Sequence, residues 1–398
     1  MRIGMMADAY KPHVSGITNY IDLNKRHLER AGHDVFVFTF GDLEHRDDEP
    51  RVIRSPGLPI QDTGFYLSFR YNRAAKRLLQ TMDVVHVHHP FLSGRLALRY
   101  ARPLRIPIVF TNHTRYDLYA QAYLPHMPEE ISGGLLKAYM PSFCKAVDLV
   151  VSPSSGMEKI LRQLGVDSPV EVVPNGVELK RFLDAEPLSR ADFGFDAEDV
   201  LFIYVGRLGP EKNLRFLLRA FRGLSEAFDR VRLLILGSGP EREELETLAS
   251  DLGLAGRVRF EGMISYDRLP AYLAMCDAFA TASVTEVHPL SVIEAMGAGL
   301  PVLGIHSPGV GDTVTDGVTG FLSSEDASAF AVKMTRLASE RELRKQMGAA
   351  AREDSTKYAI ERTTRIMLRY YEGLVRAAQP RHRGLRFRLR SFMERFNQ

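Results

Sequence analysis

Strand-like and helix-like segments alternate along most of this chain, and this alternation is the strongest constraint on its fold. Short apolar runs typical of buried strands are separated by longer stretches with helical spacing of apolar residues. In the first half the expected strands are 2–7, 34–40, 84–88, 108–112, 149–152 and 170–173. In the second half they are 200–205, 231–236, 258–260, 278–281 and 301–304. Alternation of this kind predicts parallel sheets covered by helices on both faces.

Two such series predict two domains rather than one core. Residues 178–198 are acidic, contain proline and lack a clear period, so we expect a linker there. The fold class is therefore α/β, with two Rossmann-like, doubly wound domains facing each other across a cleft. The expected boundaries are 1–178 for the first domain, 179–199 for the linker and 200–355 for the second domain.

The C-terminal part of the chain is expected to be mostly helical. The helical stretch 327–378 is expected to break near Gly348 and Asp354. Its last helix, 356–378, would return to the first domain, and a basic tail, 379–398, follows. The other helices expected in full are 15–30, 214–228, 241–252, 266–275 and 290–296.

Composition and charge narrow the possible function classes. The net charge is only +3, so we expect no nucleic-acid partner. Cys144 and Cys276 have no histidine or cysteine at ligand spacing, which argues against disulfides and structural zinc and suits a reducing compartment. Asp8 comes too early for a signal peptide, and no apolar run approaches the roughly 20 residues that span a bilayer. We expect a soluble or peripheral cytoplasmic protein of undetermined oligomeric state.

A loop between an apolar run and a helical pattern carries two carboxylates, Glu286 and Glu294. Free backbone N–H groups at such a strand-to-helix turn face the crevice where open α/β sheets bind ligands. Carboxylates cannot hold a phosphate there, but they accept hydrogen bonds from sugar or ribose hydroxyls. The alternative is a surface loop followed by an ordinary amphipathic helix.

Two cations flank a turn at the start of the second series. Arg207 follows the strand 200–205, and Lys212 lies five residues later, before a helix. The arginine guanidinium can donate two parallel hydrogen bonds, and the lysine ammonium is a compact positive charge. This pair would therefore neutralise a departing diphosphate. A solvated charged turn is the alternative. Glycine-rich turns also follow the next two strands, at Gly237 and Gly262, and several such turns at one sheet edge favour a ligand site.

Histidines follow two strands of the first series. His113 lies at the end of one strand, where an imidazole can donate to a substrate hydroxyl or assist proton transfer. The pair His88 and His89 is a rival for this role, and a lone histidine is often structural. Gly16 allows close approach of an anion at the first helix start, although a tight turn explains it equally well. No Asp-x-Asp and no His-x3-His pattern occurs, so we expect no cofactor and no divalent metal.

These motifs together resemble those of glycosyltransferase family 4, which has the GT-B fold. The resemblance spans about residues 1–375 and rests most strongly on Glu286-x7-Glu294 with the Arg207 and Lys212 pair. The first half, with Asp8-Ala9-Tyr10 and 111–114 (Thr-Asn-His-Thr), is similar to one branch of the family. That branch contains bacterial 1,2-diacylglycerol 3-glucosyltransferases and phosphatidylinositol mannosyltransferases.

The resemblance implies a metal-independent, retaining transfer of a hexose from a nucleotide-sugar, with a UDP-sugar favoured. It implies that Arg207 and Lys212 hold the diphosphate, that Glu294 bonds the ribose and that Glu286 bonds the donor sugar. The catalytic set it implies is His113, Glu286, Arg207 and Lys212. The remaining donor-binding residues are Gly16, Gly206, Gly237, Met263, His288, Leu290 and Ser291, with Met263 at the base site. The acceptor-side residues are Asp8, Tyr10, Asn19 and Tyr116.

Two departures from the family pattern fall at the sugar subsite. Val287-His288-Pro289 stands where members commonly have Gly-Phe-Gly, and Ser15 replaces the first of a usual glycine pair. Pro289 has no N–H, so one backbone donor to the sugar is missing, while those of His288, Leu290 and Ser291 remain. We therefore expect these two departures to change which sugar is bound more than which reaction is catalysed.

Basic residues suggest where the acceptor lies. The tail 381–396 holds six arginines against one glutamate, with apolar residues on one helical face, as in an interfacial helix. A second basic and aromatic patch is 65–77. Each is alternatively a charged face on a protein-packed helix. Together they predict a lipid acceptor such as diacylglycerol at the anionic inner face of the cell membrane. A soluble sugar or glycan acceptor, a nucleotide-sugar epimerase and a non-catalytic sugar-nucleotide binder remain alternatives.

Overall fold

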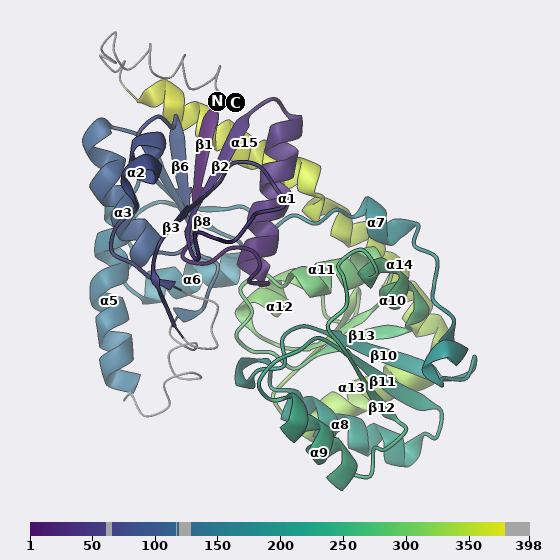
Figure 1. Cartoon of the computed structure of the whole chain (residues 1–398). Coiled ribbons are helices and arrows are strands. Elements are labelled where there is room, and N and C mark those ends of the chain that lie inside the picture. Colours follow the sequence, from purple (N-terminus) through teal and green to yellow (C-terminus); the bar gives the residue numbers. More distant parts are fainter. Residues whose placement is uncertain (61–65, 117, 119–128, 379–398) are drawn as a thin grey trace.

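The computed structural model describes residues 1–60, 66–116, 118 and 129–378. It contains two parallel sheets, one in each half of the chain (Figure 1). The basic tail and residue 65 lie outside the described residues, as do 117 and 119–128. The fold is therefore α/β with two Rossmann-like domains, as the sequence predicts.

The first sheet has seven strands in the order β3-β2-β1-β6-β7-β8-β9. Its strands are β1 (Arg2–Met6), β2 (Asp34–Phe40), β3 (Val52–Ser55), β6 (Val84–Val87), β7 (Ile108–Thr111), β8 (Leu149–Ser152) and β9 (Val170–Val172). Strand order reverses between β1 and β6, and ligands bind at such a switch point in open parallel sheets. A small antiparallel hairpin, β4 (Leu58–Pro59) and β5 (Tyr66–Leu67), stands apart from this sheet.

The second sheet has six strands in the order β12-β11-β10-β13-β14-β15. They are β10 (Val200–Val205), β11 (Val231–Leu236), β12 (Val258–Gly262), β13 (Ala278–Thr281), β14 (Val302–Ile305) and β15 (Gly320–Ser323). The order reverses between β10 and β13, which places a second switch point beside the turn that carries Arg207. The expected strands all form, with ends that match or are shifted by at most two residues, while β3, β4, β5 and β15 are not predicted.

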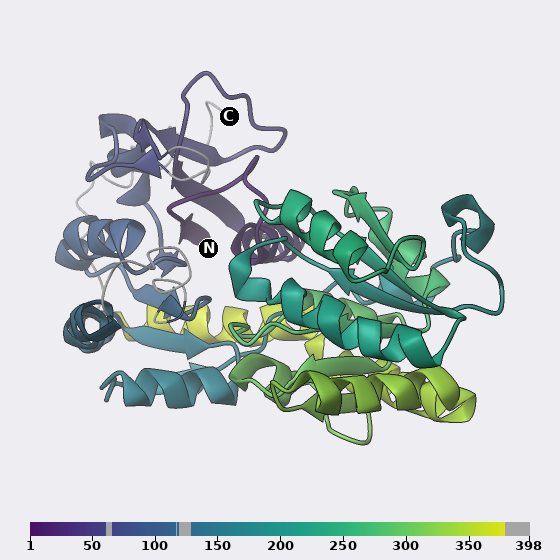
Figure 2. The same ribbon diagram turned by 90° about the horizontal axis from the view of Figure 1, so that it is seen from below.

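Helices cover both faces of each sheet (Figures 1 and 2). In the first domain they are α1 (Gly16–Arg30), α2 (Arg73–Leu79), α3 (Leu92–Tyr100), α5 (Glu129–Ala146) and α6 (Ser155–Gln163). In the second they are α8 (Leu214–Ala227), α9 (Arg242–Asp251), α10 (Leu269–Met275), α11 (Leu290–Gly297), α12 (Pro308–Thr313), α13 (Ala327–Ser339) and α14 (Arg341–Ser355). Each face of each sheet has its own cluster of buried apolar side chains, so the chain has a separate core in each domain.

The chain crosses between the domains twice. The expected linker contains a short helix, α7 (Lys180–Leu183), and a 3-10 turn at 190–193. The return crossing leads into α15 (Ile360–Ala377), which packs on α1 and on the first sheet. Val177 and Ala359 pair as a β-bridge where the two crossings meet. Met367 and Tyr371 of α15 are buried in the core of the first domain.

The predicted helix break near Gly348 is wrong. Helix α14 runs through Gly348, and the actual interruptions are at Glu340 and after Ser355. A Cβ on Gly348 would lie 2.2 Å from the carbonyl oxygen of Gly299, so the glycine serves close packing against the end of α11. The break expected near Asp354 is found within a residue of its position.

Candidate active site

The carboxyl ends of both sheets' strands meet between the two domains. The backbone N–H of Gly156, at the start of α6, donates to Asp312 Oδ2 of α12 at 2.5 Å. His13, in the loop after β1, lies close enough to Arg207 to be affected by its charge. Burial is the largest cause that lowers the pKa of His13, and the charge of Arg207 is the next. The two switch points therefore face a common space. Residues predicted from separate halves of the sequence line it.

The strongest geometric match to the predicted site is an ion pair between Lys212 and Glu286. Lys212 Nζ lies 2.6 Å from Glu286 Oε1, and each side chain is 19% exposed. Both groups therefore remain accessible to a ligand while they are paired. The pair therefore presents a hydrogen-bond acceptor and a positive charge side by side.

Glycines let the backbones of neighbouring turns approach closely. Gly237 follows β11 with φ +138°, and a Cβ there would lie 1.8 Å from the carbonyl oxygen of Gly206. A Cβ on Gly239 would meet the Leu208 carbonyl oxygen at 2.2 Å. The Leu208 N–H donates to the Ser238 carbonyl at 2.9 Å, which ties the two turns together. These contacts fix the turn that carries Arg207.

Substitution of Gly237 by alanine should therefore collapse the donor side of the site. The added methyl group requires both a left-handed conformation and a shift of Gly206, which together cost on the order of 2–4 kcal/mol. We expect a clear fall in the thermal unfolding midpoint and at least a tenfold loss of nucleotide affinity by calorimetry. Gly256→Ala provides a control, because Gly256 has a similar positive φ of 74° but no atom within 4 Å of the added Cβ. Equal effects of the two substitutions would contradict this assignment.

Glu294 is buried, and a tyrosine that the sequence analysis did not identify holds it. Tyr266 Oη donates to Glu294 Oε1 at 2.8 Å, and Glu294 is 4% exposed. Burial raises the pKa of Glu294 to about 7, and the hydrogen bond from Tyr266 opposes that rise. The tyrosine fixes the orientation of the carboxyl group and leaves Oε2 for a ligand hydroxyl.

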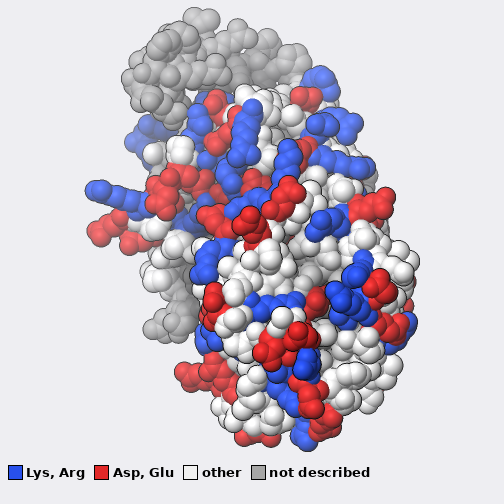
Figure 3. Space-filling model, turned by 90° about the vertical axis from the view of Figure 1, so that its right-hand side faces the viewer, with Lys and Arg blue, Asp and Glu red and all other residues white. Residues whose placement is uncertain are grey.

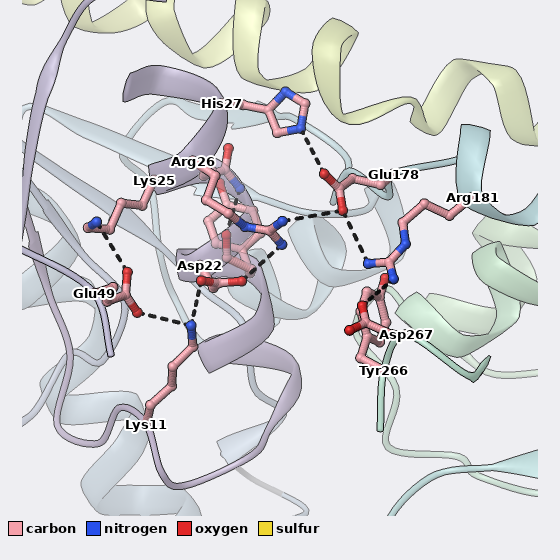
Figure 4. A network of polar contacts seen from close by, with 12 residues as sticks. Lys11, Asp22, Lys25, Arg26, His27, Glu49, Glu178, Arg181, Tyr266 and Asp267 are labelled. Atoms are coloured by element: carbon pink, nitrogen blue, oxygen red, sulfur yellow. Dashed lines mark hydrogen bonds and ion pairs between the residues drawn. The ribbon is translucent and has the colours of Figure 1, made fainter. Parts of the chain in front are cut away.

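An ion-pair network surrounds Tyr266 and joins the two domains (Figure 4). Arg181 of α7 pairs with Asp267 and packs over the Tyr266 ring, 5.1 Å from its centroid. Arg181 also pairs with Glu178 at 3.6 Å, and Glu178 in turn pairs with Arg26 of α1 at 3.5 Å. From Arg26 the network continues through Asp22 of α1 to Lys11 before α1, then to Glu49 after β2 and back to Lys25 of α1. It anchors the first crossing of the chain close to Glu294.

The unusual tripeptide after Glu286 makes contacts between domains. Val287 is 5% exposed and packs into a core cluster of the first domain. His288 Nδ1 accepts a hydrogen bond from the backbone N–H of Asn175 at 3.3 Å, and the His288 carbonyl accepts from the Asn175 side chain at 3.0 Å. The imidazole of His288 is thus turned into the domain contact. Of the groups of His288 that could bind the donor, only the backbone N–H therefore remains.

Leu290 and Ser291 begin helix α11. Pro289 is the N-cap, and no side chain caps the helix start. The N–H groups of the first turn are therefore oriented along the helix axis toward the space beside Glu286, as the sequence analysis expects of a helix start. Met263, directly after β12, is 66% exposed and is accessible to a flat ligand.

In the first domain, His113 is partly exposed and borders the space between the domains. Its Nε2 lies 3.0 Å from Nδ1 of the buried His88. The two histidine positions that the sequence leaves as rivals therefore form one unit. Burial, with His86 and His89 nearby, holds the pKa of His113 well below its usual range, so the ring is neutral at pH 7.

Gly16, Asp8, Tyr10 and Asn19 lie around the β1–α1 turn, whereas the fourth predicted acceptor-side residue, Tyr116, follows β7. Gly16 is the first residue of α1, behind a capping box of Ser15 and Thr18, and has no atom within 4 Å of an added Cβ. Asn19 lies one turn further along α1 and is half-buried. Tyr116 is half-buried, with its ring 5.1 Å from that of Phe91.

Asp8 and Tyr10 are engaged in structural contacts. Asp8 Oδ1 accepts from Ser93 N at 2.8 Å and from Ser93 Oγ at 2.5 Å, which anchors the start of α3. Tyr10 is 2% exposed and donates to Glu49 at 2.8 Å. These hydrogen bonds to Ser93 and Glu49 hold the loop after β1 in place.

Within the described part of the chain, no group of three His, Cys, Asp or Glu side chains is arranged to hold a metal ion.

Sequence comparisons agree with this geometry. Residues 14–181 match the model described as Glycosyltransferase Family 4, and 186–354 match that of Glycosyl transferases group 1. An alpha-monoglucosyldiacylglycerol synthase from Streptococcus pneumoniae is 31% identical over 81% of this chain and 75% of that protein. A protein of the same name from Acholeplasma laidlawii is 28% identical over 82% of this chain and 85% of that protein.

Solved structures share the fold. Sucrose-phosphate synthase from Thermosynechococcus elongatus superimposes with a TM-score of 0.77 at 22% identity, covering 94% of this chain and 99% of that one. Anabaena HepE in complex with UDP-glucose superimposes with a TM-score of 0.73 at 18% identity, covering 94% and 100%. The family models, the relatives and the shared fold identify a glycosyltransferase of the GT-B class. The chain belongs to glycosyltransferase family 4.

Proposed function

We propose that this protein transfers a hexose from a UDP-sugar to a membrane lipid such as diacylglycerol, with retention of configuration and without a metal ion. The observation that carries the proposal is the pair of Lys212 and Glu286, which lie 2.6 Å apart in the loops after β10 and β13 of the second sheet. It supplies a cation for the departing diphosphate and an acceptor for the sugar hydroxyls side by side.

The donor side follows from the described contacts. Arg207 and Lys212 would hold the diphosphate, and Glu294, oriented by Tyr266, would accept from the ribose. The UDP-glucose complex of HepE, which shares the fold, supports the choice of UDP. The relatives named alpha-monoglucosyldiacylglycerol synthase support a diacylglycerol-type lipid acceptor.

The bonding of Asp8 argues against a double displacement in which this carboxylate is the nucleophile. Its Oδ1 is committed to Ser93 at the start of α3, so this carboxyl group is held as part of the scaffold rather than as a nucleophile. We propose departure of the nucleotide from the same face that the acceptor hydroxyl attacks. The C–O bond to the diphosphate breaks, the acceptor oxygen bonds to the anomeric carbon, and its proton passes to the leaving phosphate oxygen.

The acceptor side combines exposed apolar and basic residues on the first domain. Leu58 of β4, Leu67 of β5 and Phe69 are 72%, 38% and 67% exposed. Arg70, Arg73, Lys76 and Arg77 follow them into α2 and are exposed. This composition suits the interface of an anionic leaflet. By contrast, acidic and basic residues are interspersed on the face drawn in Figure 3, which does not suit a polyanion.

We place the protein at the inner face of the cell membrane. No helix among the described residues is long and apolar enough to cross a bilayer. We propose peripheral attachment through the basic tail and through the exposed apolar and basic residues of β4, β5 and α2 named above.

Vesicle binding tests this attachment. The tail 381–396 carries a net charge of five, with six arginines and one glutamate, and each basic residue contributes about 1 kcal/mol at an anionic surface. We expect the full chain to sediment with anionic vesicles at low salt and to be released at high salt. Deletion of 381–398 should abolish binding, and neutral vesicles serve as the control. Equal binding to neutral and anionic vesicles would contradict the electrostatic attachment.

A soluble acceptor is the second candidate. The observation that favours it is a D-inositol 3-phosphate glycosyltransferase from Frankia alni, 31% identical over 73% of this chain and 74% of that protein. The two candidates separate in a mixed assay with inositol phosphate in solution and diacylglycerol in vesicles. Label in the organic phase supports the lipid, and label in the aqueous phase supports the soluble acceptor.

A further inference from the structure

His88, which is buried, and His113, which is partly exposed, form an imidazole pair at the carboxyl edge of the first sheet. His88 follows β6 and His113 follows the neighbouring β7, so adjacent parallel strands bring the two rings together. His88 Nδ1 lies 3.0 Å from His113 Nε2, and the ring centroids are 5.2 Å apart. The ring of Tyr20 packs against both.

Both imidazoles are neutral at pH 7. Burial, with the neighbouring histidines, holds the pKa of His88 and that of His113 well below their usual range. A neutral imidazole carries one N–H and one lone pair. The bond between the rings therefore has one donor and one acceptor, and the choice of donor determines which nitrogen of His113 carries its proton.

The other nitrogen of His88 decides between the two arrangements. His88 Nε2 is buried and has no hydrogen-bond partner within the described ranges. If His113 donated to His88, this nitrogen would carry an N–H buried without an acceptor, and such orphaned donors are rare. If His88 donates from Nδ1, only a lone pair is left at Nε2. The second arrangement puts the proton of His113 on Nδ1.

We propose that His88 is a positioning residue that holds His113 in the tautomer with Nδ1–H, so that His113 donates a hydrogen bond to the sugar of the donor. This rests on the proposed function. The Nε2 side of His113 is occupied by His88, and the ring is partly exposed, so Nδ1 is the nitrogen left for a ligand. His113 is thereby a hydrogen-bond donor and not a base.

A second buried histidine keeps His88 in place. The ring of His86 lies 4.2 Å from that of His88. His86 Nε2 is 2.7 Å from Thr111 Oγ1, and its Nδ1 is 2.6 Å from the hydroxyl of Tyr371 on α15. Helix α15 therefore supports the pair through His86.

The tautomer is measurable without activity. In protein labelled with ¹⁵N-histidine, two-bond ¹⁵N–¹H correlations report which ring nitrogen carries the proton, and a His113→Asn sample assigns the signal. We expect wild-type His113 to carry the proton on Nδ1. A proton on Nε2 would overturn the proposal even if the protein proves to be an active glycosyltransferase. Failure of the proposed function alone would leave this assignment unchanged.

Variants test the role of His88. In His88→Leu we expect loss of the single tautomer, an approximately tenfold lower kcat and an unchanged donor KM. In His88→Asn the amide nitrogen takes the place of Nδ1 as donor, and kcat should return to within about threefold of wild type. Unchanged affinity for UDP, measured by calorimetry, shows that each variant is folded. A kcat of His88→Leu equal to wild type would overturn the proposal.

Tyr371→Phe is the matched control. It removes a hydroxyl from the same buried cluster but no hydrogen bond of His113, so the Nδ1–H tautomer should persist. Loss of the tautomer in this variant too would assign it to packing of the cluster and would contradict a specific role for His88. If His88→Leu does not fold, the wild-type spectrum and His88→Asn still decide the question.

Discussion

Replacing Lys212 or Arg207 by alanine is expected to lower turnover about a hundredfold or more while the protein stays folded. A well-placed donor to a developing negative charge in a site shielded from water contributes roughly 3–4 kcal/mol, and each tenfold in rate is about 1.4 kcal/mol. Lys212 is part of the site through its 2.6 Å contact with Glu286, and Arg207 through its position beside His13. Steady-state kinetics with the purified variants measures the loss.

A cation elsewhere on the same domain provides the control. Arg222, on the exposed face of α8, pairs with Glu226 one turn away and is 48% exposed. Its replacement by alanine should leave turnover within about twofold, since exposed pairs of this kind contribute little. Near-normal turnover in both Lys212→Ala and Arg207→Ala would show that these residues do not hold the diphosphate.

Glu294→Gln is expected to weaken donor binding about 10- to 100-fold. Hydrogen bonds from ribose hydroxyls to a carboxylate contribute about 1.5–3 kcal/mol, and an amide oxygen is a weaker acceptor. Because the pKa of Glu294 is raised to about 7, the carboxylate form is fully present only above that pH. Donor affinity of the wild type should therefore increase as the pH rises through about 7, and that of Glu294→Gln should not. Calorimetric titration with UDP from pH 6 to pH 8 measures both.

The same substitution should stabilise the protein without ligand at pH 8. Burial raises the pKa of the Glu294 carboxyl from its ordinary value of 4.5 to about 7 in the folded protein. Between these values the folded state holds a proton that the unfolded chain has lost, so the free energy of unfolding decreases as the pH rises through this window. Glutamine removes this cost, on the order of 1–3 kcal/mol at pH 8, and has little effect at pH 4.5. A lower unfolding midpoint for Glu294→Gln at pH 8 would contradict this account.

The fold was largely predictable because buried parallel strands are short apolar runs between helical patterns. Strand β3 (Val52–Ser55) was missed because Arg54 interrupts the pattern and bonds Asp47, a contact that only folding creates. Strand β15 (Gly320–Ser323) is four residues long, and its pairing with β14 defines it more than its composition does. Gly348 was misinterpreted because its close contact with Gly299 is tertiary.

The positions of the candidate site residues at the strand ends were predictable, since ligand-binding side chains follow the strand ends in open α/β sheets. The partners of these side chains were not. Tyr266 lies 28 residues before Glu294, and Asn175 lies 113 before His288. No local pattern links residues at such separations, and the sheet order that brings them together is itself a long-range property. For the same reason His88 and His113 were seen as rivals rather than as a pair.

A donor-by-acceptor assay with the purified full chain tests the central claim most directly. UDP-glucose, other UDP-hexoses and GDP-mannose are each offered with diacylglycerol in anionic vesicles, with soluble sugars and with no acceptor, and both the released nucleotide and the glycosylated product are measured. The account predicts nucleotide release that depends on the vesicles, with equal amounts of α-linked glycolipid and UDP. Interconversion of the free UDP-sugar would indicate an epimerase, and binding without release would indicate a non-catalytic binder. Either result, or transfer only to soluble sugars, would contradict the proposed function.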